Sequence, residues 1–163
     1  ISSDFVVGDE DYKKQPLQST PLPKVDERQF LELLDENGRF VFNKVLTFAK
    51  SQNLSLAWGS KGFSLSVPTK GDKVPILFGY PPQSVFKQSL YTRVEYISKR
   101  IANSQDIVDL FKKQLESTGH FLSIGTNFKW LISKRYTEQD IDTFLNIIKW
   151  FNNYFSFRST DFR

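Results

Sequence analysis

Hydrophobic positions between residues 26 and 51 recur every three or four residues, as they do on the buried face of a helix. The positions are Phe30, Leu34, Val41, Val45 and Phe48. Asp26 can cap the first turn, with Gln29 three residues on as its capping-box partner. Asn37-Gly38 weakens the middle, because a helical glycine costs about 1 kcal/mol relative to alanine. The pattern predicts either one interrupted helix or two short helices, at about residues 27–35 and 39–51.

After residue 53 the hydrophobic spacing changes to every second position, which is typical of a strand with one buried face. The alternation runs through residues 54–58 and resumes over residues 63–67, and Gly59-Ser60-Lys61-Gly62 between them supplies turn residues, which predicts a hairpin. Residues 74–80 predict a third strand, in which Pro75 lacks an amide donor and so favours a sheet edge or a strand start. Residues 121–124 and 128–132 predict another strand pair.

Three more predicted helices complete the pattern. Residues 90–101 and 104–118 have helical spacing, with Ser104 as a cap and Gly119 as a stop. Thr137 caps the last helix, whose apolar stripe runs from Ile141 to Phe155. Hairpins separated by closely spaced helices predict an α+β fold. We expect an antiparallel sheet of about five strands built from hairpins, with three to five helices packed mainly on one face.

The predicted domain occupies residues 26–157. Residues 1–25 are acidic and contain three prolines, so they predict a flexible tail or linker, and residues 158–163 predict a frayed C-terminus. Methionine is absent even at position 1, which predicts that the chain is a fragment of a larger polypeptide.

Composition excludes several classes of site. Cysteine is absent, which rules out disulfides and thiolate metal sites and fits a cytoplasmic protein. No apolar run is long enough to cross a bilayer, so no membrane partner is expected. The sequence contains 16 Phe, 6 Tyr and 3 Trp, which predicts a core filled largely by aromatic rings.

Charge is divided along the chain. Residues 1–38 carry nine acidic and four basic residues, a net charge of −5, whereas residues 39–163 carry eighteen basic and nine acidic residues, a net charge of +9. A basic body favours a polyanionic partner, because Lys and Arg bind phosphates with little sequence preference.

No catalytic or metal-binding constellation stands out, so no catalytic residue, metal or cofactor is predicted. His120 is the single histidine, and whether it has a role is left open. Carboxylates fall mostly on predicted helices, where capping and solvation account for them. The Gly59-to-Gly62 turn leads into a strand rather than a helix, so it is not a phosphate cradle.

Nucleic acid is the predicted partner, as DNA or RNA. The candidate contacts are basic residues that can reach phosphates, and aromatic residues that lie near strand ends and can stack on bases. The basic set is Lys61, Lys112, Lys113, Lys129, Lys134 and Arg135, and the aromatic set is Trp58, Phe63 and Tyr80. Strand alternation predicts that Trp130 is buried and that Lys129 is exposed.

The Gly-x-x-Gly-Phe hairpin from Gly59 to Phe63, with the order of elements over residues 27–157, resembles uncharacterised α+β domains at the C-termini of prokaryotic restriction-endonuclease-like proteins. The resemblance implies an accessory module whose parent protein carries the chemistry elsewhere. No catalytic residue of such domains can be carried over to this chain.

Three functions remain open at this stage. The first is a non-catalytic accessory or binding domain of a larger prokaryotic protein that contacts nucleic acid through a basic face. The second is a protein-interaction module, including a homodimer, which requires an exposed apolar patch. The third is a small-ligand or enzymatic domain with an aromatic pocket near Trp58, Tyr80 or His120.

Overall fold

The computed structural model describes residues 22–161, with side chains as far as Ser156. Residues 1–21, which make up most of the predicted tail, lie outside the described residues. The described elements follow in chain order: α2 (Glu27–Leu33), α3 (Glu36–Ser51), β1 (Ser55–Trp58), β2 (Phe63–Thr69), β3 (Asp72–Tyr80), β4 (Ser89–Thr92), α4 (Val94–Arg100), α5 (Gln105–Ser117), β5 (Leu122–Ile124), β6 (Asn127–Leu131) and α6 (Glu138–Asp161).

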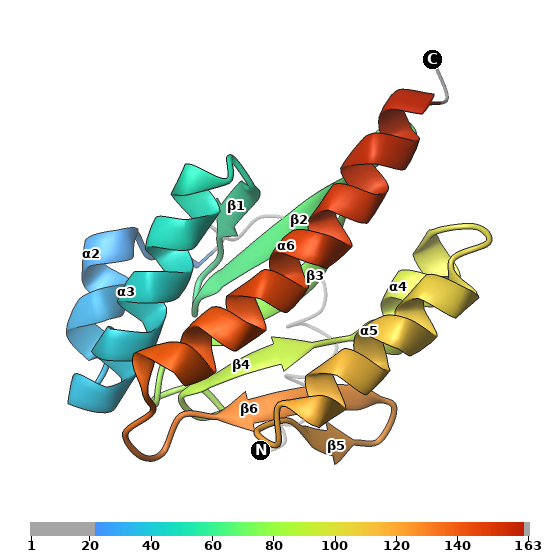
Figure 1. The fold of residues 1–163 in the computed structure, drawn as a ribbon. Helices are drawn as coiled ribbons and strands as arrows, with labels where there is room; N and C mark the ends of the chain where they lie inside the picture. The colour runs from blue at the N-terminus through green and yellow to red at the C-terminus, as the bar shows by residue number, and fades with distance from the viewer. Residues whose placement is uncertain (1–21, 162–163) are drawn as a thin grey trace, which may run out of the picture.

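The strands form one six-stranded sheet in the order β1-β2-β3-β4-β6-β5, with every neighbouring pair antiparallel. Figure 1 shows α3, α6 and α5 side by side on one face of this sheet, with α6 running diagonally between the other two. The predicted α+β class, with hairpin-built strands and helices on one face, is therefore confirmed. We call the helix-bearing side the helix face and the opposite side the open face.

Aromatic rings fill much of the space between the helices and the sheet. Phe111 of α5 stacks on Phe151 of α6 with centroids 3.9 Å apart. At the other end Phe30, Phe42 and Phe63 meet edge to face, at centroid separations of 5.1 to 5.8 Å. All five rings are at most 3% exposed. Rings thus occupy a large part of this core, as the composition predicts, and their burial stabilises the fold.

The first predicted helix is two helices, and the break lies earlier than Asn37-Gly38. α2 begins with the predicted capping box of Asp26 and Gln29 and ends at Leu33. Asp35 then caps α3, and its carboxylate accepts a hydrogen bond from Gly38 N at 2.8 Å. Gly38 therefore lies inside the first turn of α3, where a side chain would collide with Gln88.

Gln88 joins this helix corner to the sheet. Its side-chain Nε2 donates to Asp35 Oδ1 at 2.8 Å and to the carbonyl of Ile132 at 2.9 Å, and its Oε1 accepts from Asp35 N at 3.1 Å. Gln88 is only 5% exposed. A buried amide with three protein partners holds the start of α3 against the end of β6.

The prediction of a helix over residues 90–101 is wrong at its start. Residues 89–92 form β4, and the helix begins only at Val94. All four residues of β4 are buried because β4 lies in the middle of the sheet. A strand buried on both faces shows no polar alternation, so its sequence looks like part of the helix that follows.

The last helix begins as predicted. Thr137 Oγ1 accepts from Asp140 N at 3.1 Å, and Asp140 Oδ2 accepts from Thr137 N at 3.0 Å, which is a reciprocal capping box. α6 continues to Asp161, beyond the predicted domain end at residue 157. Within residues 22–161, none of the helices has the length and hydropathy that a membrane crossing requires.

Candidate nucleic-acid interface

The pairing register defines what the open face carries. Residues directly opposed on neighbouring strands point to the same side of a sheet. One row crosses all six strands in spatial order, through Ala57, Ser64, Phe78, Tyr91, Lys129 and Leu122. Five steps of about 4.8 Å between strands make this row about 24 Å long. We call it the central row.

Four aromatic rings gather on the open face, and we call them the aromatic cluster: Phe78, Tyr80, Phe86 and Tyr91. Tyr80 stacks on Phe86 at 4.5 Å and lies nearly parallel to Phe78 at 6.3 Å. Tyr91 meets Phe86 at 5.1 Å and Tyr80 at 6.3 Å. Phe78, Tyr80 and Phe86 are each partly exposed, whereas Tyr91 is 9% exposed.

The loop between β3 and β4 brings Phe86 onto the open face. Ser84 N donates to the carbonyl of Pro81 at 3.1 Å, and Phe86 N donates to Ser84 Oγ at 2.9 Å. Lys87 then adopts a positive φ of 62°, and the Ser89 hydroxyl donates to the carbonyl of Phe86 at 3.0 Å. These turns fold the loop back over β3 and β4, so Phe86 covers one side of the Tyr80 ring.

A shallow hollow of about 430 Å³ adjoins the aromatic cluster at the β1–β2 turn. Its lining includes Trp58, Lys61, Phe63, Tyr80 and Phe86. The structure thus brings together all three aromatic residues and one lysine of the sequence prediction. Phe63, however, is 3% exposed and lies between Phe30 and Phe42, so it belongs to the core.

Trp58 also points to the helix face, because it is opposed to Phe63 in the register. Its ring packs against Phe30 at 5.6 Å and against Phe63 at 5.5 Å, and it is only partly exposed. Of the three predicted aromatic contacts, Tyr80 alone lies on the open face. The sequence places all three near strand ends but does not reveal which side of the sheet each one occupies.

Close approach of two backbones shapes the edge of the hollow. A Cβ atom on Gly62 would lie 1.9 Å from the carbonyl oxygen of Gly79 on β3. Gly59 N donates to the carbonyl of Gly62 at 2.7 Å and so closes the turn that presents Lys61. Lys61 is exposed at the tip of this turn. Glycine is therefore required at position 62 for the turn to stand beside Tyr80.

On the described part of the open face, positive charge is not balanced by carboxylates. Lys129 is in the central row, Lys61 stands at the hollow, and Arg93 follows β4 at the next outward position of the alternation. Burial raises the pKa of Tyr80 and nearby Tyr91 raises it further, whereas the charge of Arg93 lowers it. Within the described strands, no Asp or Glu stands on this face, because Asp72 pairs with Arg100 of α4.

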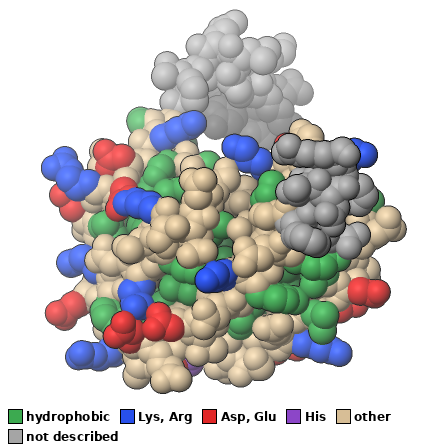
Figure 2. Space-filling view, turned by 45° about the horizontal axis from the view of Figure 1, so that its top comes forward, with side chains coloured by type: hydrophobic (Ala, Val, Ile, Leu, Met, Phe, Trp, Pro, Cys, Tyr) green, Lys and Arg blue, Asp and Glu red, His purple; other side chains and the backbone are tan. Residues whose placement is uncertain are grey.

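Charges on the helix side are mixed in sign. Lys44 bonds Glu138 at 3.0 Å and Asp142 at 3.3 Å, and Lys50 pairs with Glu27 at 2.7 Å. Figure 2 views the molecule with its top tipped forward, and Lys and Arg side chains there lie among Asp and Glu side chains around a hydrophobic area. Basic and acidic side chains are therefore interspersed on this side.

The remaining predicted basic residues do not join Lys61 and Lys129. Lys112 faces Glu95 across the α4–α5 corner, where its charge helps to lower the pKa of that carboxyl, after larger contributions from Thr126 and Lys99. Lys113 is exposed on α5. Lys134 and Arg135 lie in the loop before α6. Lys134 is over the Tyr136 ring at 5.4 Å.

His120 occupies an aromatic niche. Its ring stacks on Trp130 at 4.9 Å and meets Tyr136 at 5.0 Å, and its Nε2 lies 3.4 Å from Asp140 Oδ1. The pKa of Asp140 is lowered first by the hydrogen bond from the Thr137 backbone, and His120 contributes to the same shift. Trp130 is fully buried and Lys129 partly exposed, as the alternation predicts.

Sequence reasoning missed Phe78, Phe86, Tyr91 and Arg93. Phe78 could have been found, because it shares the period of Tyr80 within the predicted third strand. Tyr91 and Arg93 fell in the segment predicted as a helix, so no facing could be assigned to them. Phe86 lies in a loop, where alternation carries no information.

Comparison with protein-family models, curated proteins and solved structures finds no match to this chain. The resemblance of the Gly59-to-Phe63 hairpin to accessory domains therefore stays a prediction. In the described residues, no group of three or more His, Cys, Asp or Glu side chains is arranged to hold a metal ion.

Proposed function

We propose that this domain is a non-catalytic binding module and that it binds nucleic acid across its open face. The central row is the observation that carries the proposal. It places Phe78, Tyr91 and Lys129 side by side on three neighbouring strands. Sequence-tolerant nucleic-acid binding combines aromatic rings, on which bases stack, with cations that pair with phosphates.

The distribution of charge also favours the open face as the binding surface. Lys61 and Arg93 flank the aromatic cluster at two of its borders, and the described strands place no carboxylate on the open face to oppose a phosphate backbone. The helix side lacks this property, because Lys44, Lys50 and Lys99 are each paired with carboxylates there. A polyanion therefore meets less repulsion on the open face.

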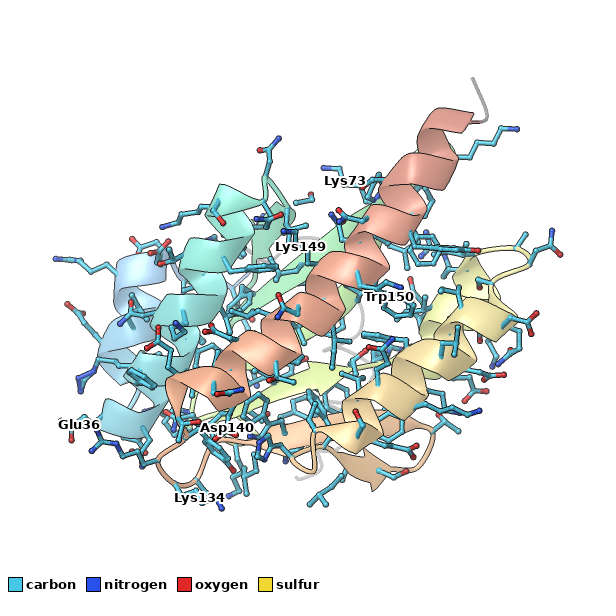
Figure 3. All side chains as sticks on the ribbon, in the orientation of Figure 1. Glu36, Lys73, Lys134, Asp140, Lys149 and Trp150 are labelled. Carbon is cyan, nitrogen blue, oxygen red and sulfur yellow. The ribbon has the colours of Figure 1, made fainter. Side chains whose placement is uncertain are left out.

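The test compares charge reversal on the two sides of the molecule. We expect Lys129→Glu to weaken binding of a labelled oligonucleotide at least tenfold in fluorescence anisotropy at 50 mM salt. The matched control is Lys149→Glu, which reverses an exposed lysine on α6 (Figure 3) and leaves affinity within about twofold. No binding by the wild-type domain, or an equal loss in both variants, refutes the proposal.

A second candidate function is self-association at the β5 edge. β5 pairs with β6 alone among the described strands, and its three residues are all exposed. Leu122 is 64% exposed and Ile124 is 48% exposed, beside Leu131 at 38%. An uncovered apolar edge strand favours pairing with another strand. Sedimentation analysis at micromolar concentration tests this candidate. We expect a dimer that Leu122→Lys dissociates, and a wild-type domain that sediments as a monomer rejects the candidate.

A further inference from the structure

From the geometry of the open face we infer that its ligand is a single strand of RNA or DNA, with bases stacked on the aromatic cluster, and not a duplex. This inference rests on the proposed function and narrows its substrate class. It follows from the arrangement of the rings, from the number of cations and from the length of the central row.

The rings form the start of a stack. Phe78 and Tyr80 are nearly parallel, with 12° between their planes, and Tyr80 and Phe86 are within 24° of parallel. Phe86 covers one side of Tyr80, and Phe78 stands at the other end of the group and is partly exposed. A base that joins at Phe78 extends this stack along β3, at the point where β3 crosses the central row. Bases in a duplex already cover one another, so their faces cannot reach these rings.

The cations are too few to suit duplex binding by phosphate contacts alone. Within the described residues, Lys61, Arg93 and Lys129 stand near the aromatic cluster and the central row, and Lys73, opposed to Pro68, points to the same face at the far end of β3. Proteins that hold a duplex mainly through its backbone make about six to ten phosphate contacts. Three contacts on a single strand predict a salt slope of about −2, so affinity falls about 16-fold between 50 and 200 mM salt. The aromatic rings must then supply much of the remaining affinity.

The length of the central row limits the ligand to a short tract. A row of about 24 Å, bordered by Lys61 near β1 and crossed by Lys129 on β6, fits about four nucleotides, the lower end of single-strand sites on sheet-based folds. Ser64 lines the hollow and is directly opposed to Phe78, where it offers a small polar side chain that does not block a base.

The experiment measures three 12-nucleotide probes by fluorescence anisotropy: single-stranded DNA, single-stranded RNA and a DNA duplex of mixed sequence. We expect at least one single strand to bind tenfold or more tightly than the duplex, with the salt slope given above. Phe78→Ala should weaken single-strand binding about tenfold, and Phe78→Leu, which keeps apolar volume but has no ring, should give a similar loss. Lys149→Glu serves again as the control.

The outcomes separate this inference from the proposed function. Duplex binding that equals or exceeds single-strand binding overturns the inference and leaves nucleic-acid binding intact. Failure of all three probes to bind overturns both. Full single-strand affinity in folded Phe78→Leu, with folding verified by its far-ultraviolet circular dichroism, also overturns the inference, because stacking then does not depend on the aromatic cluster.

Discussion

Substitution of Gln88 by alanine tests how the first helices are attached to the sheet. The change removes three side-chain hydrogen bonds, one to the carbonyl of Ile132 and two to Asp35. The bond to Ile132 is buried, so its loss costs about 1.5 kcal/mol, because the carbonyl keeps no replacement partner. The two bonds to the exposed Asp35 cost about 0.5 to 1 kcal/mol each, since water can replace the amide there.

We therefore expect Gln88→Ala to lower the free energy of unfolding by about 3 kcal/mol at pH 7. Urea denaturation followed by tryptophan fluorescence measures it, because Trp130 is fully buried in the folded domain. Gln83→Ala is the matched control. Gln83 is exposed and makes one long bond of 3.4 Å to the carbonyl of Leu33, so its loss should stay within about 0.5 kcal/mol.

The stability loss of Gln88→Ala should also depend on pH, which provides a second test of this prediction. The hydrogen bond from Gln88 is the largest cause that lowers the pKa of Asp35. A carboxyl whose folded pKa lies below its unfolded value stabilises the fold above the unfolded pKa, about 4, and this contribution is lost as pH falls through the folded pKa. Gln88→Ala weakens that contribution, so its deficit should be smaller at pH 2.5 than at pH 7. A loss below 1 kcal/mol at pH 7, or an equal loss at both pH values, would refute the reasoning.

Three further changes probe other parts of the fold, all by urea denaturation. Gly62→Ala places a Cβ 1.9 Å from the Gly79 carbonyl oxygen, so the hairpin must shift and we expect a loss above 1 kcal/mol; an unchanged midpoint contradicts the predicted clash. Phe111→Ala removes a fully buried ring from its stack in the core and should cost about 3 to 5 kcal/mol; a loss under 1 kcal/mol would mean that the ring is not packed as described. Lys44→Met breaks two ion pairs with exposed carboxylates, so we expect at most about 1 kcal/mol at low salt and less in 1 M NaCl; a loss that salt does not reduce argues against an electrostatic origin.

Elements with a strong local period were predictable from the sequence. The hairpin of β1 and β2 and the long α6 each bury one face, so apolar residues recur at the period of the element itself. The cap of α6 at Thr137 was also predictable, because its partner Asp140 is only three residues away. Such features depend on neighbours within a few residues.

Elements whose surroundings come from distant parts of the chain were not predictable. β4 lies between β3 and β6, with Leu90 in the core on the helix face and Tyr91 against Phe86 on the open face, so its residues show no alternation. The break between α2 and α3 lies at Asp35, which Gln88 contacts across 53 residues. A local pattern can indicate that a break exists near Gly38, but it contains no information about a partner so remote.

The candidate site likewise has a part that was predictable from the sequence and a part that was not. The sequence alone determined that Lys129 and Trp130 point to opposite sides of a strand, because side chains alternate on any extended backbone. Tertiary structure decided that Lys129 stands beside Tyr91 and that Tyr91 stands beside Phe78, since strand order and register are set by pairings between segments far apart along the chain. It also decided that the helices cover only one face of the sheet, which leaves the row of rings and lysine on the other.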